Sequence, residues 1–156
     1  MIRSTWISFG GTAAIVTSMS LTLGLDAAAS SRQAIVAALL IVALADNLSD
    51  SLSVHIYQEA ERLEPREAFR STLANFATRL LVGLSFVVMA IALPRELLLA
   101  ATVVWGFALL GLLTYQIART RRAPVGKEIA KHVVVAAIVV TASRWLGVWI
   151  AGTFGS

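Results

Sequence analysis

Five runs of apolar residues, separated by short polar segments, dominate the pattern of this chain. Each run is long enough to form an α-helix of about 20 residues, the length that crosses a lipid bilayer. The runs lie near residues 6–25, 34–57, 72–93, 97–118 and 130–152. Pro94, Pro124 and Gly126 interrupt the pattern between the later runs, where turns are expected. The sequence therefore predicts an all-α membrane protein in which residues 1–156 form a single domain of five transmembrane helices.

The first apolar run has the position of a secretory signal peptide, because it follows Arg3 near the start of the chain. The residues DAAAS at 26–30 also resemble the small-residue site at which such a peptide is cleaved. The apolar part of a signal peptide has about 7–15 residues, however, and this run is longer. We therefore expect it to remain in the protein as the first transmembrane helix.

The composition agrees with a membrane protein and argues against several kinds of chemistry. Apolar residues make up 58% of the chain and charged residues only 14%, whereas soluble domains carry about 25% charged residues. The absence of cysteine excludes disulfides, iron–sulfur clusters and cysteine nucleophiles. Two histidines, His55 and His132, are too few for a typical catalytic zinc cluster. No catalytic motif such as G-x-S-x-G or H-E-x-x-H occurs, so an enzyme is not predicted.

Lysine and arginine are distributed unequally between the two sets of connecting segments. One set contains nine of these residues and the other contains two. The nine are Arg3, Arg62, Arg66, Arg70, Arg119, Arg121, Arg122, Lys127 and Lys131, and the two are Arg32 and Arg95. Because cytoplasmic loops are enriched in positive charge, we predict a cytoplasmic N-terminus and an external C-terminus in a bacterial inner membrane. The net charge of +4 then reflects topology, and nucleic acid is not expected as a partner.

Four ionisable residues lie well inside the predicted spans: Asp46, Asp50, Arg79 and Arg144. Such residues are costly in a bilayer and usually mark an ion path or an internal ion pair. Two interpretations are open at this point. The aspartates belong to a transport path, or the pairs Asp50–Arg79 and Asp46–Arg144 only lock the helices together.

Oxygen-bearing side chains recur along the second run at steps of three and four residues, which places them on one face of a helix. They are Asp46, Asp50, Ser53, Tyr57, Glu61 and Glu64. The helix is expected to continue to Pro65, since the residue before a proline disfavours helix. Carboxylate oxygens suit Mn²⁺, Mg²⁺ or Fe²⁺. In the absence of a metal, two carboxylates close together in low dielectric tend to share a proton. The stripe therefore predicts a proton-coupled metal path, with Asp46 and Asp50 inside the membrane and Glu61 and Glu64 as a cytoplasmic capture site.

Three stretches resemble the vacuolar iron transporter family of Fe²⁺/Mn²⁺ transporters. The second-helix motif of that family is close to A-D-x-L-S-M-x-x-G-E-Y, and residues 45–57 read ADNLSDSLSVHIY. The positions in common are Ala45, Asp46, Leu48, Ser49 and, displaced along the helix, Tyr57. The stretches FRSTLANFATRLLVGLSFVVMAIALP and VVTASRWLGVWI are similar to the third and last helices of the family. The resemblance covers about residues 8–152.

The resemblance implies a five-helix protomer that forms a homodimer, with a cation path lined by the first two helices. It implies export of Fe²⁺ or Mn²⁺ in exchange for protons, with no permanently bound cofactor and with membrane lipid as the surroundings. The chain departs from the family at Gly10, where an aspartate is expected, at Asp50, where a methionine is expected, and at Val54, where a glutamate is expected. The cytoplasmic glutamate-rich module is reduced to YQEAERLEPRE.

A carboxylate in place of a thioether shifts the preference toward harder cations such as Mn²⁺. Two alternatives therefore stay open beside metal export. The chain is a structural or accessory membrane protein whose aspartates pair with Arg79 and Arg144, or it transports another cation.

Overall fold

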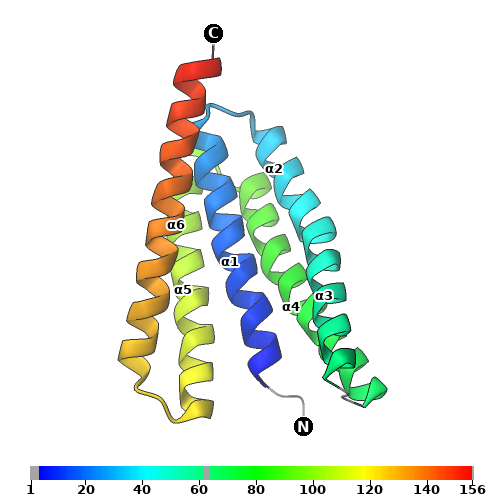
Figure 1. The fold of residues 1–156 in the computed structure, drawn as a ribbon. Helices are drawn as coiled ribbons and strands as arrows, with labels where there is room; N and C mark the ends of the chain where they lie inside the picture. The colour runs from blue at the N-terminus through cyan, green and yellow to red at the C-terminus, as the bar shows by residue number, and fades with distance from the viewer. Residues whose placement is uncertain (1–3, 62–63, 156) are drawn as a thin grey trace.

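The computed structural model describes residues 4–61 and 64–155, and the side chains from residue 10 onward within these ranges. Every element of regular secondary structure in this part of the chain is a helix (Figure 1). The elements are α1 (Ser4–Ala27), α2 (Arg32–Ile41), η1 (Val42–Asp46), α3 (Asn47–Ala60), α4 (Pro65–Ala92), α5 (Arg95–Arg121) and α6 (Val125–Phe154). The first three elements after α1 follow one another without a break and form a single long helix.

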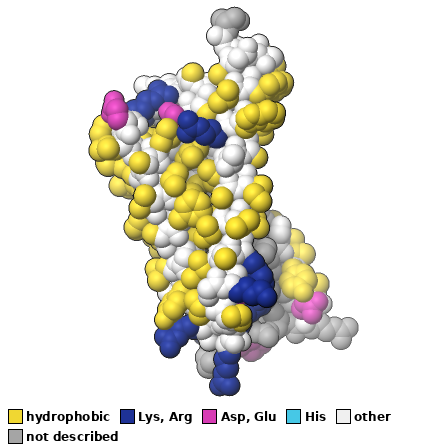
Figure 2. All heavy atoms as spheres, turned by 90° about the vertical axis from the view of Figure 1, so that its left-hand side faces the viewer, with side chains coloured by type: hydrophobic (Ala, Val, Ile, Leu, Met, Phe, Trp, Pro, Cys, Tyr) yellow, Lys and Arg dark blue, Asp and Glu magenta, His cyan; other side chains and the backbone are white. Residues whose placement is uncertain are grey.

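Four helices are long and apolar enough to cross a membrane, namely Arg32–Ala60, Pro65–Ala92, Arg95–Arg121 and Val125–Phe154. Most of their apolar side chains face outward, and only 17% of the most apolar part of α6 is buried. Figure 2 shows hydrophobic side chains covering the middle of one face of the bundle, with lysine and arginine gathered toward its ends. A lipid bilayer covers such a surface, so the coarse prediction of an integral membrane protein is supported.

α1 has 24 residues and runs through the middle of the bundle, where it contacts α4, α5 and α6. The helix formed by α2, η1 and α3 packs mainly on α4, at the edge of the bundle away from α6 (Figure 1). α1 begins at one end of the bundle, and α6 ends at the opposite end (Figure 1). Met19 of α1 is fully buried and lies over Gly106 of α5, so its side chain packs between these two helices.

The end of the second long helix differs from the sequence prediction. α3 ends at Ala60, so the expectation of a helix continuing to Pro65 is wrong. Glu61 is the C-terminal cap, and Glu64 is the N-terminal cap of α4 with extended backbone at ψ 132°. Proline at the first position of α4 accounts for the non-helical backbone of Glu64, because it disfavours helix at the residue before it and suits the first turn of a new helix. Glu64 therefore does not share a helix with Asp46.

The middle of the same helix contains a π-helical segment, Val42–Asp46. π-Helical turns are rare and occur frequently at functional sites. The wider turn also rotates the residues that follow it relative to an ideal α-helix. The segment ends at Asp46, one of the two intramembrane aspartates, so the local backbone departs from the regular helix where the candidate chemistry begins.

Candidate functional site

Arg79 occupies the buried face of α4 near the middle of that helix. Small and polar residues recur on this face, namely Ala68, Ser71, Asn75, Arg79 and Gly83. The Arg79 side chain is only 5% exposed. Gly10 of α1 makes room for it, because a Cβ at that position would collide with Asn75 Oδ1 and lie 3.0 Å from Arg79 Cδ. A glycine at position 10 thus allows an arginine to enter the bundle.

The guanidinium of Arg79 bridges both intramembrane aspartates. Arg79 Nη2 donates to Asp46 Oδ2 at 2.7 Å, and Arg79 Nη1 lies 3.0 Å from Asp50 Oδ2. Asn75 Nδ2 also donates to Asp50 Oδ2, at 3.5 Å. The Asp46 side chain is 54% exposed and that of Asp50 30% exposed, so the cation is far more buried than its two partners. One turn of helix separates the carboxylates, which allows both to reach a single cation.

The predicted Asp50–Arg79 pair is confirmed, whereas the predicted Asp46–Arg144 pair is wrong. Arg144 is exposed on α6 and forms no ion pair or hydrogen bond with any residue that the structure describes. Its neighbour Ser143 packs against Gly24 of α1, so the next side chain points away from the bundle. α6 packs on α1 and α5, while Asp46 lies on the helix that packs on α4.

Buried polar side chains continue from Arg79 along the contact between α3 and α4. We call this group the polar seam; it consists of Asn47, Ser51, Gln58, Ser71, Asn75 and Arg79. Within it Asn47 Nδ2 donates to the carbonyl of Phe76 at 3.0 Å, and Gln58 Nε2 donates to Ser71 Oγ at 2.8 Å. Five of its buried polar atoms lack a partner within the described ranges: Asn47 Oδ1, Ser51 Oγ, Gln58 Oε1, Asn75 Oδ1 and Arg79 Nε. Unpaired buried groups of this kind are costly and commonly bind water or an ion.

The three seam residues on α3 are Asn47, Ser51 and Gln58. Each follows a residue of the predicted stripe by one position, so the seam lies on a neighbouring face of the same helix. Of that stripe, Ser53, Tyr57 and Glu61 are exposed, and Ser53 Oγ donates to the carbonyl of Ser49. Glu64 is also exposed. A sequence signal for the seam does exist, because Ser71, Asn75 and Arg79 are polar residues at steps of four within an apolar run.

Little space is available beside the ion pairs for a metal in this arrangement. A cavity of about 10 Å³ borders Asp46, Asn47 and Arg79, and a volume of about 10–15 Å³ holds one water molecule. No group of three or more histidine, aspartate or glutamate side chains is placed to hold a metal ion within residues 4–61 and 64–155. A metal at Asp46 and Asp50 would therefore have to compete with Arg79.

Comparisons with models of protein families, with curated proteins and with solved structures find no match to this chain. The resemblance to vacuolar iron transporters therefore stays a prediction from the sequence. The site has to be interpreted from its own geometry.

Proposed function

We propose that this protein is a membrane transporter that exports a divalent cation, Fe²⁺ or Mn²⁺, in exchange for protons. The observation that supports it is the charge of the central cluster. Asp46 and Asp50 share one guanidinium, and no second cation pairs with them in the part of the chain that the structure describes. One carboxylate charge is left over in a region of low dielectric, where it attracts a proton or a metal ion.

Arg79 has a defined role in this proposal. In the arrangement described above it holds both carboxylates, so an entering cation must displace it before the oxygens are free to coordinate. Two carboxylates one turn apart present oxygen ligands to a single hard cation, as Mn²⁺ prefers. When Arg79 returns to the carboxylates, the metal loses its ligands. The buried, partly unpaired groups of the polar seam supply oxygens between this point and the end of α3.

The topology and assembly belong to the same proposal. α1 is the fifth span, the N-terminus lies in the cytoplasm, and the C-terminus lies outside, as the lysine and arginine bias indicates. Asp46 is half exposed at the middle of an apolar helix. Lipid hydrocarbon does not solvate a carboxylate, which supports a homodimer in which the second copy covers this edge of the bundle.

A second candidate function is that of a structural or accessory membrane protein. Two observations favour it: both aspartates touch Arg79, and the cavity beside them is about 10 Å³. In this interpretation the cluster locks the α3–α4 contact and no ion passes.

Metal-driven proton movement in proteoliposomes tests the transport proposal. We expect Fe²⁺ or Mn²⁺, added in a series with Mg²⁺, Co²⁺ and Zn²⁺, to drive proton flux through the wild-type protein. Asp50→Asn is expected to abolish this flux, because it removes a charged ligand while retaining the shape of the side chain. The matched control is Glu96→Gln, since Glu96 is exposed at the start of α5. Wild-type flux in Asp50→Asn would remove Asp50 from the mechanism, and no flux with any metal would favour the structural role.

A further inference from the structure

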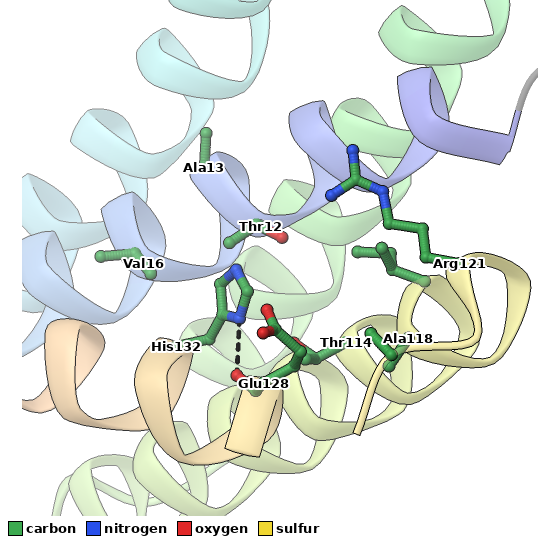
Figure 3. Close-up of a pocket in the computed structure, with 10 residues that line it drawn as sticks. Thr12, Ala13, Val16, Thr114, Ala118, Arg121, Glu128 and His132 are labelled. Carbon is green, nitrogen blue, oxygen red and sulfur yellow. Dashed lines mark hydrogen bonds between the residues drawn. The ribbon is translucent and has the colours of Figure 1, made fainter. Parts of the chain in front are cut away.

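A cavity of about 500 Å³ lies between α1, α5 and α6, and none of the residues that line it belongs to the Arg79 cluster. Figure 3 shows its lining, with the His132 ring and the Glu128 carboxylate side by side on α6 and Thr12 facing them from α1. Thr114 and Arg121 of α5 complete the polar part of the wall. The rest of the lining consists of Ala13, Val16, Ile117, Ala118 and Ala123, so the cavity combines charged and apolar walls.

Several polar atoms on the wall of this cavity are available to form hydrogen bonds with a ligand. The His132 Nδ1 lies 2.8 Å from the carbonyl of Glu128 and must donate to it, because a carbonyl only accepts. The other ring nitrogen, Nε2, is therefore available to accept a hydrogen bond from a ligand. Glu128 Oε1 accepts from Lys131 Nζ at 2.8 Å, which leaves Oε2. Thr114 is 1% exposed, and its hydroxyl has no hydrogen-bond partner among the described residues. A buried unpaired hydroxyl on the wall of a cavity with charged groups indicates a binding site.

A second, largely apolar groove lies along the contact between α1 and α6. It has a volume of about 360 Å³ and shares Val16 with the cavity. On α6, Glu128 and His132 of the cavity and Val139 and Ser143 of the groove fall on one helix face, at steps of four, seven and four residues. On α1 the groove extends from Val16 to Leu25, about 14 Å at the helical rise of 1.5 Å per residue. A charged pocket and an apolar groove thus border the same residue of α1, Val16, and the same face of α6.

We propose that the cavity and the groove together bind one phospholipid with a zwitterionic amine headgroup. Arg121 offers a cation for the phosphate, and Glu128 offers a carboxylate for the ammonium. Val16, Leu21 and Leu25 receive an acyl chain. The pairing of opposite charges on the wall decides the headgroup class, since a purely anionic headgroup brings no ammonium to the Glu128 Oε2 that Lys131 leaves open. This site is independent of the proposed transport path.

Lipid retention by the purified protein tests this proposal. The protein in detergent is incubated with equal amounts of phosphatidylethanolamine, phosphatidylcholine and phosphatidylglycerol, and bound lipids are counted by native mass spectrometry. We expect preferential retention of phosphatidylethanolamine. Glu128→Gln should lower the ratio of phosphatidylethanolamine to phosphatidylglycerol by about tenfold, the effect of losing one charge-assisted hydrogen bond. Glu96→Gln, at the other end of α5, should leave the ratio unchanged.

Two further measurements distinguish the contribution of the lipid headgroup from that of the acyl chain. Val139→Trp fills the groove and should reduce retention of all three lipids equally, while the melting temperature shows that the protein is still folded. Soluble phosphoethanolamine should not displace the bound lipid. Equal retention of the three lipids by the wild type, or an unchanged ratio in Glu128→Gln, would overturn the headgroup assignment. Displacement by phosphoethanolamine, or wild-type retention in Val139→Trp, would overturn the role of the groove.

Discussion

Replacement of Arg79 by leucine is expected to lower the free energy of unfolding by about 1–3 kcal/mol, less than the cost of breaking a fully buried ion pair because the two carboxylates are partly exposed. The variant leaves Asp46 and Asp50 in the bundle without the guanidinium that both contact at 3.0 Å or less. It also removes the side chain whose Cδ lies beside Gly10. The measurement is denaturant-induced unfolding of the purified protein in micelles, followed by circular dichroism.

Arg144→Leu is the matched control for this experiment, since Arg144 is the other arginine within a predicted span and is exposed on α6. We expect it to leave stability unchanged or to increase it. Combining Arg79→Leu with Asp46→Asn and Asp50→Asn should recover part of the lost stability, because no uncompensated charge then remains. Equal effects of Arg79→Leu and Arg144→Leu would show that the ion pairs contribute nothing to folding.

Replacement of Gly147 by alanine is expected to destabilise the protein by about 1–3 kcal/mol, the range for inserting a methyl group into a packed contact. A Cβ at this position would collide with the backbone carbonyl oxygen of Gly24 and lie 2.9 Å from the Cβ of Ala27. A backbone atom has no rotamer into which it can move, so α1 and α6 must separate. The same unfolding measurement checks the result.

Gly152→Ala is the control on the same helix, because nothing lies within 4 Å of the Cβ that it would add. We expect unchanged stability or a gain of up to about 1 kcal/mol from the higher helix propensity of alanine. If both alanine variants behave alike, close contact between α1 and α6 is not what requires glycine at position 147.

Stability and flux measured on the same variants separate the two candidate functions. For a transporter, Asp50→Asn should remove flux at a small cost in stability, because Arg79 keeps Asp46 as a partner. For a structural protein, no variant changes flux, and Arg79→Leu has the dominant effect through folding alone. Both interpretations therefore assign a role to Arg79, and the flux of the Asp50→Asn variant is the result that distinguishes them.

Gly83 of α4 illustrates why the partners of Arg79 could not be read from spacing. The sequence suggested Arg79 as a partner of Asp50 and Arg144 as a partner of Asp46, without indicating which helix would lie beside the two aspartates. In the structure, glycine at position 83 lets Ala43 approach to within 3.1 Å of where its Cβ would lie, so the helix carrying both aspartates packs on α4. The π-helical turn at Val42–Asp46 adds a local rotation that periodicity does not predict.

The sequence by itself determined the helical elements and the membrane character of this protein. An apolar run of about 20 residues must satisfy its backbone hydrogen bonds internally, so it forms a helix whatever its neighbours are. Proline at position 65 likewise determined the start of α4, through its own backbone geometry.

Only the tertiary structure decided which side chains meet. Helix packing buries Asn47, Ser51 and Gln58 against α4 and leaves Ser53 and Glu61 exposed. It also places both aspartates beside Arg79, while Arg144 is exposed. It also brought Thr114, Glu128 and His132 from two helices to one cavity. The physical reason is that local sequence sets the period of a helix, whereas its rotation and its neighbours are set by contacts with the other helices.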